Sequence, residues 1–391
     1  MKQKPGVRYV IVAAGGELAG VDLNQPFLDA SGQNHASLSW GDYFHGVEHF
    51  LRRHACTLAA LTGQKAGRGL PPAEIEQMII RSEKHGAFYH ISCVEVLSGG
   101  TEAKFTVSTA VSPRGRAWMK HEFNVLGNLN KMFNLPYLPP VYVLDEVNLR
   151  LDNGGVPATM FLSGWFDGYH EWHLTRQGGE QNIEIWDVKN GYRPASAAES
   201  YAIYQKASQI LTLYYNPADY SEIYPWHHAA GDFVVRTGGE VDVKLITARK
   251  YGPVLTFPKA QKSNSFIALV YFFINLTVQM RLDKYNGVGD AAWAQAACLP
   301  AVVEGFFAAW REKEKTGGCS PGRVEEIWSL LKSFGRDELK NILYSLPAYY
   351  RREDPADLAL IESNLDKHAG QLHDVLQDFD PRPDVRDGRA G

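Results

Sequence analysis

The two most informative segments of this 391-residue chain are Pro225-Trp226-His227-His228-Ala229-Ala230-Gly231-Asp232-Phe233-Val234-Val235 and Val243-Lys244-Leu245-Ile246-Thr247-Ala248-Arg249. Between them lies Thr237-Gly238-Gly239-Glu240, which is typical of a tight turn, so two short paired strands are predicted over residues 233–236 and 241–246. His227 and Asp232 then lie on the loop before the first strand. Thr247 and Arg249 directly follow the second strand.

Upstream of these segments, hydrophobic periodicity predicts the order strand, strand, helix, strand, strand. The predicted elements are strands 88–97 and 104–111 around a Ser98-Gly99-Gly100-Thr101 turn, helix 117–132, and strands 141–147 and 160–165. Downstream, residues 197–214 form a strongly periodic helix, and the chain from residue 264 onward is predicted to be mostly helical.

The first 82 residues are predicted to form an α/β extension. Residues 7–13 have the composition of a strand, and residues 40–61 have that of an amphipathic helix with Ser39 as its N-cap. Residues 72–82 are also predicted to be helical. At the other end, residues 381–391 are rich in Asp, Arg, Pro and Gly, which favours a disordered tail.

The paired segments resemble the catalytic loop and metal-binding strand of the protein-kinase-like superfamily, and they are most similar to aminoglycoside-phosphotransferase-like small-molecule kinases. The resemblance implies an α+β fold with two lobes, a small sheet-containing lobe at 83–165 and a large, mostly helical lobe at 166–380. It places His227 at the catalytic-base position, Asp232 at the metal-binding Asn and Thr247 at the metal-binding Asp. In another register, Asp232 takes the catalytic Asp position. Glu122 is similar to the Glu that pairs with the nucleotide-binding Lys.

The departures from this family are specific. The strand expected to carry the Lys is Phe105-Thr106-Val107-Ser108-Thr109-Ala110, with Ser or Thr in its place, and no G-x-G-x-x-G loop precedes it. Thr247 lacks the carboxylate that a hard cation prefers. The first hypothesis is therefore a non-phosphorylating protein that binds a small molecule or a protein in the cleft between the lobes.

The second hypothesis is an atypical small-molecule phosphotransferase that uses ATP and Mg²⁺. His227 would act as its general base, and Asp232 would be the remaining metal ligand. The alternative interpretation of Asp232 is a loop Asp that caps nearby backbone N–H groups. Glu122, Thr247 and Arg249 would line the cofactor site, with Arg249 as a compensating cation. Without its Lys, Glu122 is otherwise interpreted as a solvated helix residue.

The third hypothesis is a metal-dependent enzyme built on histidines. Tyr169-His170-Glu171-Trp172-His173 places two histidines at i and i+3, which would share one side of a helical turn and could bind Zn²⁺ together with His227 or His228. The plainer interpretation is that His170 and His173 line the mouth of the cleft or cap the next helix.

Composition narrows the remaining classes of function. The net charge is −4 and there is no basic stripe, so nucleic-acid binding is not expected. The four cysteines lack metal-ligand spacing, and no apolar stretch is long enough for a membrane span or a signal peptide, so we expect a cytoplasmic protein. Phe306, Phe307, Trp310 and Trp328 are expected either to pack the large lobe or to form a homodimer face.

Overall fold

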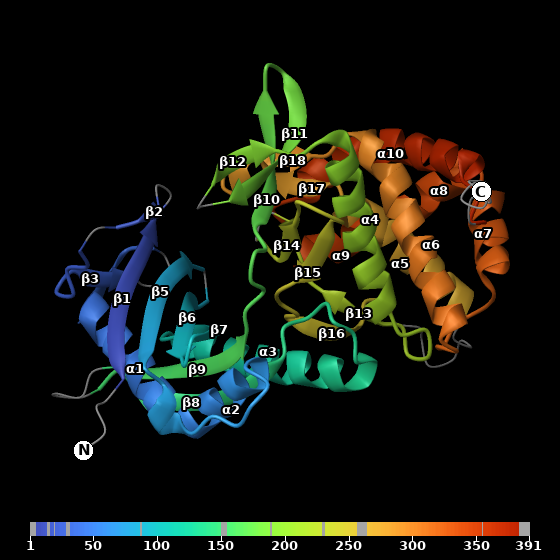
Figure 1. The fold of residues 1–391 in the computed structure, drawn as a ribbon. Helices are drawn as coiled ribbons and strands as arrows, with labels where there is room; N and C mark the ends of the chain where they lie inside the picture. Colours follow the sequence, from blue (N-terminus) through green and yellow to red (C-terminus); the bar gives the residue numbers. More distant parts are fainter. Residues whose placement is uncertain are drawn as a thin grey trace. The chain divides into compact units, whose positions relative to one another are not determined.

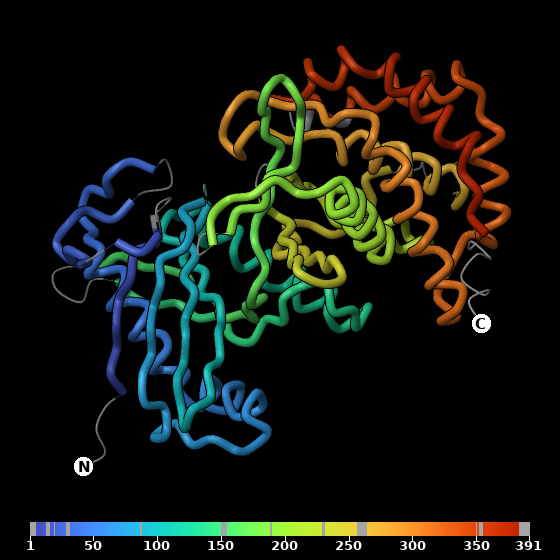
Figure 2. The backbone as a smooth tube through the Cα atoms, turned by 45° about the horizontal axis from the view of Figure 1, so that its top comes forward, coloured from blue at the N-terminus to red at the C-terminus, as the bar shows by residue number. Residues whose placement is uncertain are grey.

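The computed structural model describes residues 5–13, 16–18, 20–28, 32–86, 88–149, 155–187, 190–228, 231–255, 264–353 and 355–382. The chain has an α+β fold with a large mixed sheet and several helices (Figures 1 and 2). It divides into two compact units, residues 1–167 and residues 168–391. Most of the predicted tail, 383–391, lies outside the described residues.

Unit 1 is built on a seven-stranded sheet with the order β2-β1-β5-β6-β7-β9-β8. Its strands are β1 (Gly6–Ala13), β2 (Gly16–Glu17), β5 (Gln77–His85), β6 (His90–Ser98), β7 (Thr101–Ala110), β8 (Val141–Asn148) and β9 (Pro157–Gly164). The pair β1–β5 is parallel and the other pairs are antiparallel. Between β2 and β5 in the chain, β3 (Pro26–Leu28) and β4 (Asn34–Ser39) pair as a separate two-stranded antiparallel sheet.

Helices cover both faces of the sheet. Because side chains alternate along a strand, Ala103, Phe105 and Val107 of β7 share one face, and they pack in a common core with α1 (Trp40–Arg53) and α2 (Ala55–Lys65). On the other face, Ala110 packs with Met119 of α3 (Pro113–Phe133). α3, which carries Glu122, is therefore packed against the sheet through Met119.

Two sequence predictions for this unit need correction. The predicted helix 72–82 is wrong, because only Pro72–Glu74 forms a short 3₁₀ helix (η1) and β5 follows. β5 pairs with β1 on one side and β6 on the other, so long-range pairing determines its conformation. The predicted helix 40–61 begins at Ser39 as expected, with a capping box to Asp42, but it is broken at His54, which has non-helical torsion angles.

Unit 2 combines small sheets with a helical body. Its strands are β10 (Glu171–Gln177), β11 (Glu180–Asp187), β12 (Gly191–Pro194), β13 (Ser221–Tyr224), β14 (Phe233–Arg236), β15 (Asp242–Leu245), β16 (Lys250–Pro253), β17 (Leu282–Lys284) and β18 (Ala291–Trp293). Its α-helices are α4 (Ala197–Tyr214), α5 (Ser265–Gln279), α6 (Leu299–Lys315), α7 (Val324–Ser333), α8 (Arg336–Leu343), α9 (Pro347–Glu353) and α10 (Leu358–Asp378). Two 3₁₀ helices, η3 (Tyr285–Gly287) and η4 (Ala296–Cys298), join them.

The helical body is packed around α4 and α6, which lie side by side. Gly305 of α6 permits this close approach, because a Cβ there would lie 2.0 Å from the backbone oxygen of Gln205. Phe306, Phe307 and Trp310 are fully buried, so these three side chains belong to the core of the unit. Among the described residues, we find no helix with the length and apolar character needed to cross a bilayer.

Candidate functional site

The predicted loop lies at the base of two nested strand pairs in unit 2. β13 pairs with β16, and β14 pairs with β15 between them. This nesting brings the loop before β14 next to the segment after β15, where the backbone N–H of Ile246 donates to the carbonyl oxygen of Asp232 at 2.8 Å. Gly231 has a φ of +65°, a conformation that glycine adopts without steric strain, and it turns the chain into Asp232.

Asp232 forms a two-pronged ion pair with Arg249. Arg249 donates from Nη1 to Oδ2 at 2.5 Å and from Nη2 to Oδ1 at 2.6 Å. The backbone N–H of His227 donates to the same Oδ2 at 2.8 Å. Asp232 is only 2% exposed, whereas the side chain of Arg249 is 20% exposed. Both carboxylate oxygens are therefore already engaged by cationic or N–H donors.

His227 bonds to a residue that sequence reasoning missed. Its Nε2 lies 2.8 Å from Oδ2 of Asp357, which directly precedes α10 and is 3% exposed. The side chain of His227 is 18% exposed. The two residues are 130 positions apart, so their contact cannot be predicted from a local sequence pattern.

His228, the neighbouring histidine, has a different environment. Its ring lies 4.5 Å from that of Trp172, and Trp226 and Phe233 also contact it. Neither ring nitrogen has a hydrogen-bond partner among the described residues. Burial lowers the pKa of His228 to about 4, so the imidazole is neutral near pH 7. Its surroundings are those of a core residue.

The structure thus brings four of the predicted site residues together in unit 2: His227, Asp232, Thr247 and Arg249. Thr247 follows Ile246, which bonds to Asp232, and it is buried. The cation next to Asp232 is a guanidinium group of the chain itself. A cation that approached Asp232 would therefore meet a buried carboxylate whose charge Arg249 already balances.

Glu122, the fifth predicted residue, lies on α3 in unit 1. It is 1% exposed, so the interpretation as a solvated residue is wrong. Its Oε2 accepts a hydrogen bond from the hydroxyl of Tyr89 at 2.8 Å. The neighbouring Phe88 stacks on Trp118 of the same helix, with 5.7 Å between ring centroids. These contacts hold Phe88 and Tyr89 against α3, next to the buried carboxyl group of Glu122.

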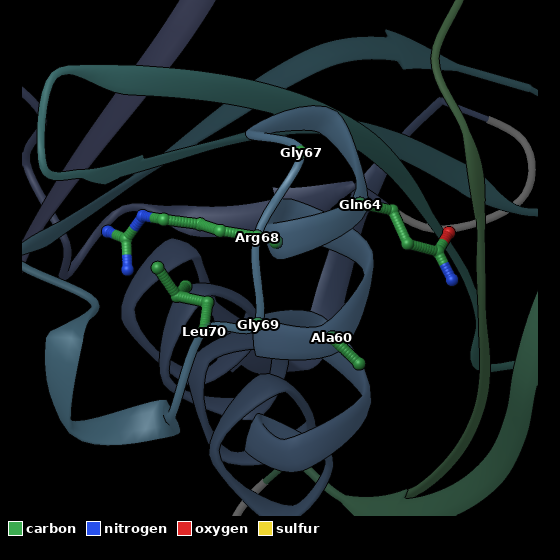
Figure 3. Close-up of a pocket in the computed structure, with 7 residues that line it drawn as sticks. Ala60, Gln64, Gly67, Arg68, Gly69 and Leu70 are labelled. Carbon is green, nitrogen blue, oxygen red and sulfur yellow. The ribbon is translucent and has the colours of Figure 1, made fainter.

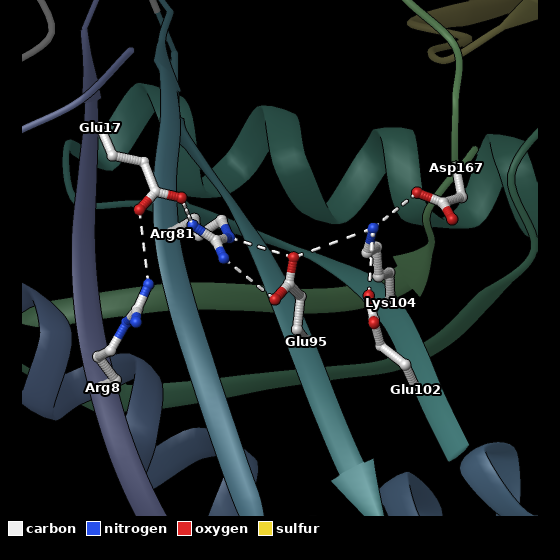
Figure 4. A network of polar contacts seen from close by, with 7 residues as sticks. All are labelled: Arg8, Glu17, Arg81, Glu95, Glu102, Lys104 and Asp167. Atoms are coloured by element: carbon white, nitrogen blue, oxygen red, sulfur yellow. Dashed lines mark hydrogen bonds and ion pairs between the residues drawn. The ribbon is translucent and has the colours of Figure 1, made fainter. Parts of the chain in front are cut away.

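Lys104 of β7 belongs to a network of charged side chains on the sheet of unit 1 (Figure 4). Its Nζ lies 2.8 Å from Asp167, 3.2 Å from Glu102 and 3.9 Å from Glu95. Burial alone would lower the pKa of Lys104, but these carboxylates outweigh it and raise the pKa. Arg81 bridges Glu95 to Glu17 in the same network, and Arg8 also contacts Glu17. Each cation of this network therefore lies next to at least one carboxylate.

The prediction of a helical turn with two histidines is wrong. His170 pairs through its backbone with Val235, and His173 lies in β10, so the i and i+3 side chains point to opposite faces of a strand. His173 has carboxylates near both nitrogens, Glu171 at 3.5 Å from Nε2 and Asp283 at 3.7 Å from Nδ1. In the part of the chain that the structure describes, no three His, Cys, Asp or Glu side chains gather closely enough to hold a metal ion.

A pocket at the end of α2 offers little chemistry. It is lined by Ala60, Gly63, Gln64, Gly67, Arg68, Gly69 and Leu70 (Figure 3). Arg68 supplies its charged group, and that guanidinium already forms an ion pair with Glu74 at 2.8 Å. Binding sites generally combine an apolar lining with several convergent polar groups, which this pocket does not have.

Comparisons with known proteins do not assign the chain to a protein family. No family model matches the chain. The "Sodium-dependent nutrient amino acid transporter 1" of Drosophila persimilis is 23% identical over 163 residues, which is 38% of this chain and 25% of the transporter. The protein of the same name from Drosophila pseudoobscura pseudoobscura is 22% identical over the same shares. The chain therefore spans a quarter of the length of these curated relatives, and this partial similarity does not assign it to their family.

Proposed function

We propose that this chain is a kinase-like protein that does not transfer phosphate and instead binds a small molecule or a protein partner through the loop that contains His227 and Asp232. The observation that carries the proposal is the ion pair between Asp232 and Arg249. It uses both oxygens of the carboxylate that the family resemblance assigns to metal binding.

The proposed two-lobed kinase-like arrangement is supported by the order of elements within each unit. In unit 1, β6, β7, α3, β8 and β9 follow the order strand, strand, helix, strand, strand. In unit 2, the loop with His227 leads into the hairpin of β14 and β15, and Thr247 follows that hairpin. Both features match the resemblance on which the proposal rests.

The electrostatics support the absence of metal-dependent phosphoryl transfer. This reaction depends on positioning and on cations that neutralise the developing charge on the phosphoryl group. In this chain, Asp232 is neutralised by Arg249, and Glu122 is bound by Tyr89 in a buried position. Thr247 offers a hydroxyl group where a carboxylate is expected. A phosphate-bound Mg²⁺ would therefore have no free carboxylate from Asp232.

Thermal denaturation with nucleotide tests the proposal. The melting temperature is measured with ATP, with ADP and without nucleotide, each with Mg²⁺ and with EDTA. We expect Mg²⁺ to add no stabilisation by either nucleotide, since a ligand raises the melting temperature only when it binds the folded state. A Mg²⁺-dependent rise with ATP that disappears in Asp232→Asn would refute the proposal.

A second candidate function is the atypical phosphotransferase, and one observation favours it. The bond between His227 and Asp357 resembles the pairing in which a carboxylate orients a histidine that acts as a general base. The same nucleotide experiment separates the two candidates, because this one requires Mg²⁺-dependent nucleotide binding. With ATP radiolabelled on its γ-phosphoryl group, this candidate requires transfer of the label to a hydroxyl-bearing small molecule, with ADP as the leaving group.

A further inference from the structure

The side chain of Asp357 does not make the hydrogen bond that is usual for an aspartate just before a helix. Asp357 immediately precedes α10, where an Asp side chain normally accepts a hydrogen bond from a backbone N–H in the first turn. In this protein the Asp357 side chain makes no such bond. It is directed instead toward His227, with 2.8 Å between Oδ2 and Nε2. The helix thus gives up a capping interaction, and the carboxylate is used to hold a distant loop.

His227 is held by two different carboxylates. Its backbone N–H donates to Asp232 and its ring contacts Asp357. Asp232 is fixed in turn by Arg249, which also donates to the backbone oxygen of Pro225 at 3.3 Å. The backbone N–H of His227 is thus held by Asp232, and its imidazole is held by Asp357 at the start of α10.

The helix α10 is a rigid support for Asp357. Its side chains Leu365, Leu372 and Leu376 are fully buried in unit 2. His368, also in α10, lies 3.0 Å from the hydroxyl of Thr277 and 3.1 Å from Nη1 of Arg281. With the helix anchored in this way, a bond from its N-cap residue can fix the direction of a side chain elsewhere in the unit.

We propose that Asp357 is the positioning residue for His227. The N-terminus of α10 then supports the loop that we propose binds the ligand. An ionised carboxylate only accepts hydrogen bonds, so Asp357 holds His227 in the form that carries a proton on Nε2. Asp357 also sets the direction of the His227 imidazole, which is 18% exposed and is the more accessible of the two loop histidines. This inference rests on the proposed function, because it assumes that the loop with His227 and Asp232 binds the ligand.

NMR spectroscopy of the ¹⁵N-labelled full chain tests the positioning role. In the wild type, we expect Nε2 of His227 to be protonated, and we expect Asp357→Asn to shift the ¹⁵N resonances of that imidazole. The matched control is Asp366→Asn, which removes a carboxylate from the same helix where it contacts Lys340 at 3.0 Å on the surface. The control should leave the His227 resonances unchanged.

Two outcomes would overturn the inference. One is a wild-type His227 that carries its proton on Nδ1 alone, a result that needs no variant. The other is an Asp357→Asn protein in which only the amide signals of the first turn of α10 change, because Asp357 would then act on the helix end alone. Neither outcome involves nucleotide, so the inference can fail while the proposed function stands, and the reverse is also true.

Discussion

Arg249 and Asp232 face each other at the base of the β14–β15 hairpin, with both guanidinium Nη atoms on the two carboxylate oxygens at 2.5 and 2.6 Å. Because the aspartate is almost completely buried, its charge depends on this partner. The ion pair fixes the loop before β14, and under our proposal it also keeps the Asp232 carboxylate from binding Mg²⁺. Several measurable consequences follow from it and from the other buried groups.

Arg249→Met should destabilise the protein strongly. Removing one partner of a buried ion pair leaves an uncompensated charge, which typically costs about 3–5 kcal/mol, and the partial exposure of Arg249 places the expected loss near the lower end. Urea denaturation followed by circular dichroism measures this loss. The matched control is Arg336→Met, which breaks an exposed pair with Asp374 and should cost less than about 1 kcal/mol. Equal losses in the two variants would contradict the structural role of Asp232–Arg249.

Tyr89→Phe should destabilise unit 1 by removing a hydrogen bond from the buried Glu122 carboxyl group. Leaving a buried polar group without its hydrogen-bond partner costs about 1–3 kcal/mol. Tyr344→Phe is the control, since its hydroxyl donates to Asp366 over the same 2.8 Å but on the surface. Chemical denaturation should show a clear loss for the first variant and almost none for the second. A stable Tyr89→Phe protein would indicate that Glu122 is satisfied without Tyr89.

Glu222→Gln should stabilise the protein at neutral pH. Burial in β13 raises the pKa of Glu222 to about 8, well above its value in an unfolded chain. The folded protein therefore takes up a proton at this site, and stability is lost as pH rises from about 4.5 toward 8. At pH 7 the variant should gain at most about 3 kcal/mol, and this gain should vanish below pH 4. Glu240→Gln, at a residue whose side chain is 90% exposed, should show no such pH dependence. A Glu222→Gln protein with a pH-independent stability difference from the wild type would refute the assignment.

His173 should add stability on the acid side of neutrality. Burial lowers the pKa of His173, but Asp283 and Glu171 outweigh it, and the pKa is raised above its ordinary value. The contribution is fully present below the unfolded pKa of about 6.5 and is lost as pH rises through the folded pKa. The free energies of unfolding of the wild type and His173→Gln, measured between pH 5.5 and 9, should therefore converge as pH rises. A difference that grows toward alkaline pH would show that the imidazole is neutral in the folded protein.

Elements with strong local signals could be predicted from the sequence. The helix 197–214 and the strand 233–236 have the predicted bounds, because helical periodicity and a Gly-Gly turn are local properties. The strand β5 was missed because its conformation depends on pairing with β1, which is more than sixty residues earlier in the chain. β10 was missed for a similar reason, since it pairs with β11 and bridges to β14. Non-local pairing overrides such weak local preferences.

In the candidate site, too, local features could be predicted from the sequence and long-range contacts could not. The loop register placed Asp232, His227, Thr247 and Arg249 in one region, because the hairpin between them is short. The partners that define their chemistry were not visible in the sequence. Asp357 contacts His227 from 130 residues away, and Tyr89, which directly precedes β6, contacts Glu122 from 33 residues away. Burial was also misjudged for Glu122, since an isolated helical Glu is usually exposed.

Binding of Mn²⁺ as a substitute for Mg²⁺ tests most directly whether Asp232 is withheld from metal. The electron paramagnetic resonance signal of free Mn²⁺ is followed as the full-length protein is titrated with the ion, in parallel with Asp232→Asn. We predict that the wild type and the variant leave the same amount of free Mn²⁺ at every point. Loss of one equivalent of free ion in the wild type, absent in Asp232→Asn, would show that the carboxylate binds metal in spite of Arg249 and would contradict the account.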